Sequence, residues 1–466
     1  MTYFLAVDIG ASSGRHILGH VENGRMVLEE IYRFDNTLVK RNGHLCWDVD
    51  NLYNHILAGL RACGEAGKIP VTMGIDTWAV DFVLLDENGG RLGDSVAYRD
   101  GRTADMDRVV EALVPPEELY ARTGIQKQPF NTIYQLAALR QSSPELLEKA
   151  QRLLMIPEYF HYHLTGVMMN EYTNATSTAL VSAAGREWDR ELLQRLGYPE
   201  RLFGALHMPG TVVGNFTPDV QEAVGFDCTV VLPATHDTGS AYLAVPARDE
   251  SGVFLSSGTW SLLGVENMSP ITTEDSRRAN FTNEGGYQYR YRYLKNIMGL
   301  WMIQSIRRDL NKAYSYAELE QLARDEAAFP SLVDANDSRF LAPDSMLEEV
   351  KAACRDSGQP VPETVGQVMQ CVYNSLAACY AAAIDELSSL TGKRYTCLHI
   401  VGGGSKDGYL NALTARTTGL PVYAGPTEGT ALGNLIVQFL RAGLFPDLAA
   451  ARAAIPDSFP IATIYP

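Results

Sequence analysis

Short apolar runs and segments of helical periodicity alternate along the whole chain. Apolar runs over 4–7, 16–18 and 26–32 predict strands, and Asn23-Gly24 predicts a tight hairpin turn between the last two. Apolar side chains recur every three or four residues over 50–63, which predicts a helix with one buried face. Strands mixed with amphipathic helices predict an α/β fold with a largely buried sheet.

The alternation continues to the C-terminus. Residues 105–200 are richer in helical patterns, and a polar joint at 246–252 separates them from a second series of strands and helices. Further predicted strands cover 71–75, 82–85, 230–232, 253–256, 398–401 and 422–424, and further predicted helices cover 365–390, 408–418 and a last segment opening at 428–434.

The length of 466 residues is too great for one ordinary domain. We expect the boundary at the polar joint, which gives an N-terminal domain over 1–248 and a C-terminal domain over 249–466. The strand, Ser-rich turn and strand at 253–264 repeat the pattern at 5–18. This repeat suggests two related halves, but it is too short to establish a duplication.

Composition and charge exclude several classes of protein. The chain carries 39 Lys and Arg against 55 Asp and Glu, a formal charge of −16, whereas a nucleic-acid-binding or acidic-membrane surface needs a basic stripe. No apolar stretch approaches the ~20 residues of a membrane span, and the N-terminus lacks the basic region of a signal peptide. None of the seven cysteines forms a C-x-x-C pair. We therefore expect a cytoplasmic protein with no nucleic-acid or membrane partner.

The first candidate site follows the first predicted strand. Asp8 stands at the strand end, and Gly10, Ser12, Ser13 and Gly14 come next. Glycines at positive φ would bring backbone N–H groups up to a phosphate, and Asp8 could hold a hydrated Mg²⁺. A Gly-rich hairpin whose Asp and Ser side chains bond their own backbone explains the same residues, so both interpretations stay open.

The second candidate site is Thr235-His236-Asp237-Thr238, between a predicted strand and a predicted helix. The Asp237 carboxylate could take a proton from a substrate hydroxyl, and His236 could bond a sugar hydroxyl. Alternatively, Asp237 is the N-cap of a helix beginning near Gly239, and His236 is a structural residue.

Two further groups carry candidate chemistry. Asp76, Trp78 and Asp81, with Arg99 and Arg102 after them, suit a polyhydroxylated ligand, although a buried Trp with ion pairs around it is equally consistent.

Three consecutive glycines, Gly402 to Gly404, leave a bare surface for a flat ring such as adenine and expose a helix N-terminus to phosphate; a ligand-free turn is the alternative. Residues 295–304 look like a helix start. Asn296 and Gln304 are polar residues among apolar neighbours there, which suits a ligand contact, but capping and surface exposure also account for them.

Asp8-x-Gly10, Gly258-Thr259, the three glycines and His236-Asp237 together resemble the FGGY family of carbohydrate kinases. The resemblance implies the actin-like ATPase fold, an α/β fold in which two RNase-H-like domains have a cleft between them. Several segments are similar to the members of the family that phosphorylate L-rhamnulose, namely 10–15, 74–82, 97–100, 129–131, 171–176, 256–261 and 294–301. The similarity spans about residues 4–440.

The resemblance also implies roles for individual residues. ATP and Mg²⁺ would be the cofactors, and a ketose would be the small-molecule partner of a monomer or small homo-oligomer. Asp237 would accept the proton of the sugar's 1-hydroxyl, and Asp8 would hold Mg²⁺ through water. The sugar would be contacted by Trp78, Ala79, Asp81, His236, Asp237 and Thr238, and ATP by Ala11, Ser12, Ser13, Gly14, Arg15, Thr259, Asn296, Gln304 and Gly402. The N-terminal domain would then bind the sugar and the C-terminal domain the nucleotide.

The predicted reaction is transfer of the γ-phosphoryl group of ATP to O1 of L-rhamnulose. Two departures bear on it: Ala79 stands where the family usually has Gly, which could narrow the sugar pocket, and Lys406-Asp407 replaces an uncharged pair after the glycines. An FGGY kinase for fuculose, xylulose or ribulose is the nearest alternative, followed by an actin-like sugar sensor without catalysis. A dehydrogenase is disfavoured because the glycines lack the G-x-G-x-x-G spacing.

Overall fold

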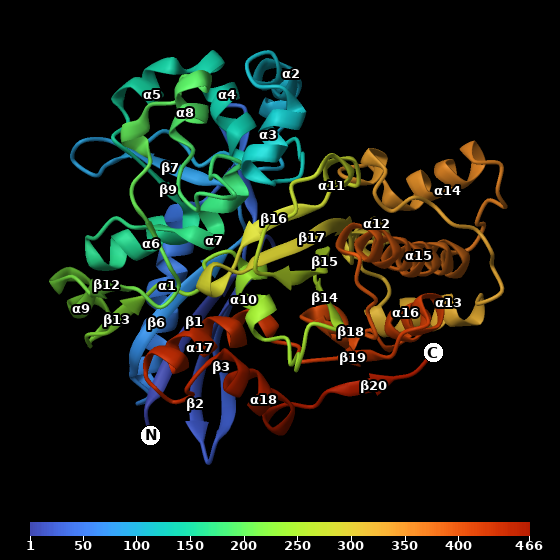
Figure 1. Ribbon diagram of the computed structural model, residues 1–466. Helices are drawn as coiled ribbons and strands as arrows, with labels where there is room; N and C mark the ends of the chain where they lie inside the picture. The colour runs from blue at the N-terminus through green and yellow to red at the C-terminus, as the bar shows by residue number, and fades with distance from the viewer. The chain divides into compact units, whose positions relative to one another are not determined.

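The computed structural model describes residues 1–466, which divide into two compact units (Figure 1). Unit 1 comprises Met1–Ala244, Glu266–Tyr293 and Thr430–Ser458, and unit 2 comprises Val245–Val265, Leu294–Gly429 and Phe459–Pro466. The chain first leaves unit 1 next to the polar joint where we expected a boundary. Two later segments return to unit 1, however, so the units are interleaved along the sequence and do not follow a single cut between 248 and 249.

A six-stranded sheet in the order β12-β13-β6-β1-β2-β3 forms the centre of unit 1. β1 pairs antiparallel with β2 and parallel with β6, and β6 pairs parallel with β13. The predicted turn at Asn23-Gly24 joins β2 to β3, with both residues at positive φ, 51° and 76°. The strands are β1 (Tyr3–Ile9), β2 (Ser13–Glu22), β3 (Arg25–Asp35), β6 (Pro70–Thr77), β12 (Val212–Asn215) and β13 (Thr229–Val231).

Helices cover both faces of this sheet. Leu5, Val7 and Ile9 of β1 share one core with apolar side chains of α1, α6 and α9. Strand residues alternate between faces, and Phe4 accordingly meets Phe439 of α17 edge-on at 5.2 Å on the other face. Helices of this unit are α1 (Val49–Glu65), α6 (Ile156–Thr165), α7 (Tyr172–Ala175), α9 (Pro218–Val224), α10 (Asp237–Leu243), α11 (Glu274–Arg278), α17 (Gly429–Arg441) and α18 (Leu448–Ser458).

A second core of unit 1 forms around a three-stranded sheet in the order β8-β7-β9. Residues 105–200 supply most of its helices, as their helical patterns predict. Its elements and the short two-stranded pairs are β4 (Leu38–Arg41), β5 (His44–Trp47), β7 (Phe82–Leu85), β8 (Arg91–Leu92), β9 (Arg152–Met155), β10 (Asn170–Glu171), β11 (Leu206–His207), α2 (Met106–Glu111), α3 (Pro116–Thr123), α4 (Thr132–Ser142), α5 (Pro144–Lys149) and α8 (Arg190–Leu196).

The second large sheet has the strand order β16-β17-β15-β14-β18-β19-β20. β14 pairs antiparallel with β15 and parallel with β18, β18 pairs parallel with β19, and β19 pairs antiparallel with β20. The series β2-β1-β6-β13-β12 has the same directions, so the repeat suggested by the sequence is present as a repeated topology. The strands are β14 (Gly252–Ser257), β15 (Trp260–Asn267), β16 (Thr282–Gly285), β17 (Tyr291–Met298), β18 (Cys397–Val401), β19 (Val422–Ala424) and β20 (Ala462–Ile464).

The helices of unit 2 gather around the long helix α15, which Figure 1 shows in orange-red. They are α12 (Trp301–Asp309), α13 (Tyr316–Asp325), α14 (Met346–Asp356), α15 (Val365–Thr391) and α16 (Gly408–Thr418). None of the helices combines the length and the apolar character that a membrane span requires.

One predicted helix start is wrong. Residues up to Met298 continue as strand β17, and α12 begins only at Trp301. Gly299 explains the shift, because a Cβ atom there would lie 2.7 Å from the backbone nitrogen of Ser261 in β15. The chain therefore runs close beside β15 before it turns into the helix, and Asn296 lies on a strand.

Candidate active site

Two aspartates lie side by side at the carboxyl ends of β1 and β6. Asp8 and Asp76 are register partners in this parallel pair, and both are buried. Arg15 Nε lies 3.2 Å from Asp8 Oδ2, and Asn434 Nδ2 of α17 donates to Asp76 Oδ2 at 2.6 Å. Burial raises the pKa of Asp76 well above its ordinary value, and the nearby Asp8 and Asp237 carboxylates raise it further.

This carboxylate pair fits a hydrated divalent cation. Asp76 Oδ1 is buried and accepts no hydrogen bond from the protein, and a cation would relieve the repulsion between the carboxylates. No cluster of three or more His, Cys, Asp or Glu side chains is arranged to hold a metal ion directly. The two carboxylates could hold an ion with water completing its shell, and the metal role of Asp8 stays a prediction. Asp76 was expected only as a sugar contact, not beside a cation.

The loop between β1 and β2 is a fixed turn. Gly10 N donates to Ser13 O at 2.8 Å, and the buried Asn36 donates from Nδ2 to Gly10 O at 2.9 Å and from its backbone nitrogen to Ser12 O at 3.0 Å. The expected positive φ is wrong for both Gly10 and Gly14. Gly14 is required by packing instead, since a Cβ atom there would lie 2.1 Å from the Phe34 ring. Ala11, Ser12 and Ser13 are at least partly exposed.

Asp237 is the first residue of helix α10, with His236 in the N-cap position. The suggested N-cap role of Asp237 is therefore wrong. Its Oδ1 accepts hydrogen bonds from Thr238 N at 2.6 Å and Thr238 Oγ1 at 3.1 Å, and lies 3.3 Å from His236 Nε2. All three contacts use Oδ1, and the side chain is 33% exposed. Oδ2 therefore makes no hydrogen bond with the protein.

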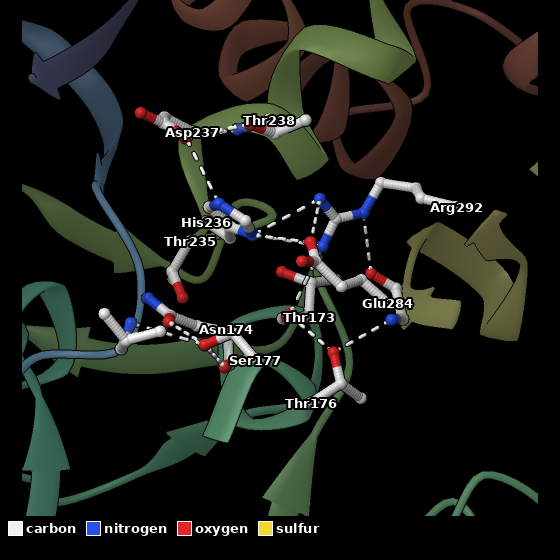
Figure 2. A network of polar contacts seen from close by, with 12 residues as sticks. Thr173, Asn174, Thr176, Ser177, Thr235, His236, Asp237, Thr238, Glu284 and Arg292 are labelled. Carbon is white, nitrogen blue, oxygen red and sulfur yellow. Dashed lines mark hydrogen bonds and ion pairs between the residues drawn. The ribbon is translucent and has the colours of Figure 1, made fainter. Parts of the chain in front are cut away.

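His236 is held on its other edge by an ion pair. Its Nδ1 lies 3.2 Å from both Nη1 and Nη2 of Arg292 and 3.1 Å from Glu284 Oε2, and Arg292 Nη1 lies 2.9 Å from the same Glu284 oxygen. Figure 2 shows the imidazole between Asp237 on one side and this pair on the other. Burial would raise the pKa of Glu284, but the charge of the neighbouring Arg292 counteracts it, and that pKa lies below its ordinary value.

Neither Glu284 nor Arg292 was expected at the site. The sequence does contain one indication of a buried ion pair, because Arg292 stands inside the apolar run Tyr291-Arg-Tyr-Leu294. Charged side chains are almost never fully buried unless they are paired. Its partner could not be identified from the sequence.

Glu171 fixes the segment that precedes His236. Its buried carboxylate accepts hydrogen bonds from Thr235 N at 3.1 Å and Thr235 Oγ1 at 2.8 Å, and from Thr173 N, Thr173 Oγ1 and Asn174 N at the start of α7. Burial raises the pKa of Glu171 although these donors favour its charged form. The backbone that carries His236 and Asp237 is thereby tied to a second element.

Asp81 has its carboxylate fully engaged within the protein. Oδ2 accepts from Trp47 Nε1 at 2.6 Å, Trp78 Nε1 at 3.0 Å and Tyr98 N at 3.0 Å, while Oδ1 accepts from Gln135 Nε2 at 2.8 Å. Trp78 is buried against Trp47, with ring centroids 4.0 Å apart. This arrangement matches the buried-Trp alternative, and sugar contacts by Trp78 and Asp81 remain predictions.

Ala79 stands at the start of a strained turn. Val80 has a φ of +67°, and Asp81 N donates to Ala79 O at 2.9 Å, which makes a γ-turn. Thr132 Oγ1 donates to Val80 O at 2.6 Å and Gln135 Nε2 to the same oxygen at 3.2 Å. The partly exposed Ala79 is therefore held in a defined position.

In unit 2, the three glycines after β18 differ in their surroundings. Gly402 has a φ of +89°, and a Cβ atom there would lie 2.8 Å from Ser257 O. A Cβ atom at Gly404 would lie 1.9 Å from Ser257 Oγ, whereas one at Gly403 would meet nothing within 4 Å. Gly402 and Gly404 therefore allow close packing against β14, and Gly403 presents open backbone, which fits a flat ring.

The other predicted ATP contacts of unit 2 lie around the start of α12. Thr259 O accepts from Trp301 N at 3.0 Å, and Gln304 lies partly exposed on that helix. Asn296 Oδ1 is buried and accepts no hydrogen bond from the protein. Asp407 belongs to the Lys406-Asp407 pair, which departs from the family pattern. Its carboxylate accepts hydrogen bonds from Leu410 N at 2.9 Å, which caps α16, and from Tyr373 Oη at 2.9 Å, so Asp407 has a structural role.

Comparison with known proteins gives matches over nearly the whole chain. The model described as the FGGY family of carbohydrate kinases, N-terminal domain, matches residues 3–244, and that of the C-terminal domain matches residues 253–442. The chain is 50% identical over 459 residues to a rhamnulokinase from Oceanobacillus iheyensis, covering 98% of this chain and 97% of that protein. A rhamnulokinase from Bacillus subtilis is 42% identical over 467 residues, covering 99% and 95%.

Solved structures show the same fold at low sequence identity. Gluconate kinase from Lactobacillus acidophilus superposes with a TM-score of 0.81 at 16% identity, covering 100% of this chain and 94% of that one. Plasmodium falciparum glycerol kinase with ADP gives 0.80 at 14% identity, with the same coverage. The predicted α/β, actin-like fold is confirmed.

Proposed function

Because the chain belongs to the FGGY family of carbohydrate kinases, we propose that it transfers the γ-phosphoryl group of ATP to O1 of L-rhamnulose, giving L-rhamnulose 1-phosphate and ADP. The relatives named rhamnulokinase, 42% and 50% identical over nearly the full length, support this acceptor. The observation that carries the proposal is the Asp237 carboxylate, whose contacts with the protein all use Oδ1 and whose side chain is 33% exposed.

Asp237 acts as the general base. Its Oδ2 accepts the proton of the O1 hydroxyl as the oxygen bonds to the γ-phosphorus and the bond to the β,γ-bridging oxygen of ATP breaks. An ionised carboxylate is a weak base, so the proton moves late, and this step contributes about 10²–10⁴-fold. The larger contribution comes from aligning O1 with the phosphorus, for which we assign sugar contacts to Ala79, His236 and Thr238.

We assign ATP to the turn at Ala11–Arg15 and to Thr259, Asn296, Gln304 and Gly402. The open backbone at Gly403 and the unpaired Asn296 Oδ1 support this assignment. Asp8, with Asp76 beside it, would hold Mg²⁺ through water, and the ion when bound neutralises charge on the phosphate oxygens. The sugar-binding role of residues 1–248, the nucleotide-binding role of 249–466, the oligomeric state and the cytoplasmic location stay predictions.

A panel of ketoses tests the acceptor. We expect L-rhamnulose to give the highest kcat/KM among L-rhamnulose, L-fuculose, D-xylulose and L-ribulose when ADP release is coupled to an optical assay, and ³¹P–¹H NMR to place the phosphate on C1. A kcat/KM about tenfold higher for another ketose would refute the proposed acceptor while leaving the kinase class intact.

The Asp237→Asn substitution tests the base. It keeps the side-chain volume but removes the proton acceptor, so kcat is expected to fall by about 10²–10⁴-fold while the affinity for ATP stays within about twofold. Asp189→Asn is the matched control, because Asp189 caps α8 and pairs with Arg122 in the same unit. Unchanged turnover in Asp237→Asn would refute the assigned base, and a protein that binds both ligands without turnover would be a sensor.

A further inference from the structure

We infer that Glu284 and Arg292 are positioning residues that fix the proton of His236 on Nε2 and so reserve Oδ2 of Asp237 for the substrate hydroxyl. This inference rests on the proposed function, in which Asp237 is the base. Both residues are buried, and Arg292 is 0% exposed. They reach Asp237 only through the imidazole of His236 (Figure 2).

Arg292 determines which nitrogen of His236 carries the proton. A guanidinium group has only donors and keeps its charge in proteins, so it cannot accept a hydrogen bond from an imidazole N–H. Both Nη1 and Nη2 lie 3.2 Å from Nδ1 of His236. Nδ1 must therefore present its lone pair to Arg292, and a neutral imidazole then carries its proton on Nε2.

Glu284 stabilises the buried guanidinium of Arg292. A buried guanidinium needs a counter-charge, and Glu284 Oε2 supplies it at 2.9 Å from Nη1. The same oxygen lies 3.1 Å from His236 Nδ1, where a proton on that nitrogen would be attracted to it. The two neighbours thus favour opposite tautomers, and the double contact from Arg292, together with its pairing to Glu284, favours the lone pair on Nδ1.

The remaining donors of Arg292 keep its plane fixed. Nε donates to Gly285 O at 3.0 Å and Nη2 to Thr173 O at 3.4 Å. Gly285 N in turn donates to Thr176 Oγ1 at 2.8 Å. The guanidinium is therefore held by backbone carbonyl groups of two different segments, and it can orient the imidazole without adjusting to it.

The proton on Nε2 has a consequence for the base. Nε2–H becomes the third donor to Oδ1 of Asp237, with Thr238 N and Thr238 Oγ1. If the proton moved to Nδ1, an Nε2 lone pair would face a carboxylate oxygen at 3.3 Å and repel it. The carboxylate would then rotate, and Oδ2 would lose its alignment toward the sugar hydroxyl.

Arg292→Lys and Glu284→Gln test the inference. An ammonium group cannot form the two-nitrogen contact, and a neutral amide removes the counter-charge. We expect each to lower kcat for L-rhamnulose by about tenfold or more, as small misalignments do, with the KM for ATP within about twofold. In a ¹H–¹⁵N spectrum of histidine-labelled protein, assigned with His236→Gln, the wild type should show the proton on Nε2. Arg292→Lys should shift it partly or wholly to Nδ1, whereas Glu284→Gln, which removes the oxygen that attracts a proton on Nδ1, should leave it on Nε2.

Two comparisons separate positioning from general damage to the fold. Arg452→Lys changes another buried Arg–Glu pair of unit 1, Arg452 with Glu266 at 2.8 Å, and should leave kcat within about twofold. In a His236→Gln background, whose amide has no tautomer to fix, Arg292→Lys should change kcat by less than about twofold. An equal loss of kcat in Arg452→Lys, or an undiminished effect in the His236→Gln background, would overturn the inference.

The spectrum distinguishes this inference from the proposed function. If the wild type fails to phosphorylate L-rhamnulose but carries the His236 proton on Nε2, the acceptor is wrong and the positioning stands. A wild-type proton on Nδ1 would overturn the positioning whatever the acceptor is.

Discussion

Val80 is a β-branched residue held at a φ of +67°, where such residues are sterically strained. The turn is maintained by hydrogen bonds to Val80 O from Thr132 and Gln135. Strain of this kind costs about 1–3 kcal/mol and concentrates at functional sites. At this position it holds Ala79, the residue that departs from the family's Gly.

Replacing Val80 by Gly should therefore cost less stability than the same change at an unstrained buried valine. The loss of buried apolar surface is partly offset by relief of the strained φ, whereas Val83→Gly loses the same surface in strand β7 with no such relief. We expect Val80→Gly to be less destabilising than Val83→Gly by about 1–3 kcal/mol in urea unfolding. Equal losses would show that the turn is not strained.

The sequence predicts site residues where a motif stands next to a strand end. Asp8 and Asp237 were proposed because each follows a predicted strand; in the structure both lie near Asp76, and their roles stay predictions. Glu284 and Arg292 were missed because they come from a segment far along the chain from His236, and their pairing is a tertiary event. The alternative N-cap role of Asp237 is wrong because α10 begins two residues earlier than expected.

The turn from β18 into α16 contains three glycines, and replacing each by Ala should affect either stability or ATP binding. Gly402→Ala and Gly404→Ala should lower the urea midpoint, because their Cβ atoms would press on Ser257 and Gly402 also has a positive φ. Gly403→Ala should keep the midpoint and raise the KM for ATP, since its methyl group projects into open space where we assign adenine. A Gly403→Ala protein with unchanged KM for ATP would contradict that assignment.

Helix α6 and strand β6 are joined by His161, whose Nε2 accepts from Ile75 N at 3.0 Å. Burial lowers the pKa of His161 from 6.5 to about 3. Between pH 6.5 and pH 3 the unfolded chain therefore binds a proton that the folded chain excludes. The contribution of neutral His161 to the free energy of unfolding is complete above pH 6.5 and is lost as the pH falls toward 3. The loss is about 1.4 kcal/mol per pH unit.

His161→Gln keeps an acceptor for Ile75 N but does not titrate. Between about pH 7.5 and about pH 5, we expect the free energy of unfolding to fall about 2 kcal/mol less in this variant than in the wild type. Parallel curves for the two proteins would show that His161 is not held neutral. His16, whose pKa burial lowers to about 4, contributes equally to both curves.

Elements with a strong local pattern were predicted within a few residues. The bounds of β7, α16 and β19 match, because an apolar run or a helical period ends there at a charged residue, a proline or a glycine. The helix expected from residue 295 failed because its polar and apolar residues also suit a strand, and only the approach of Gly299 to β15 decides between the two.

In the whole molecule, the interleaving of the two units along the sequence determines which fragments of the chain can fold independently. Asn434 and Gln438 of α17 donate to the backbone of Gly74 and Leu5 in the sheet of unit 1, so this sheet is completed by the C-terminal part of the chain. A composition shift at 246–252 reveals where the chain first leaves unit 1, but no local pattern reveals that it returns.

A fragment of residues 1–248 should therefore fail to form a stable domain. It lacks 266–293 and 430–458, which would leave one face of the sheet uncovered. We expect no cooperative thermal transition and no near-ultraviolet circular dichroism, in contrast to the full chain. A fragment that unfolds cooperatively at a temperature close to that of the full chain would show that the returning segments are dispensable.

The return of α17 to the first sheet also governs biosynthesis. On the ribosome, the strands that carry Asp8 and Asp76 emerge early but wait for more than three hundred further residues before Asn434 can close over them. Native-like burial of these strands is thus a late, nearly post-translational event, and a nascent chain stalled before this helix would expose apolar surface to chaperones and proteases.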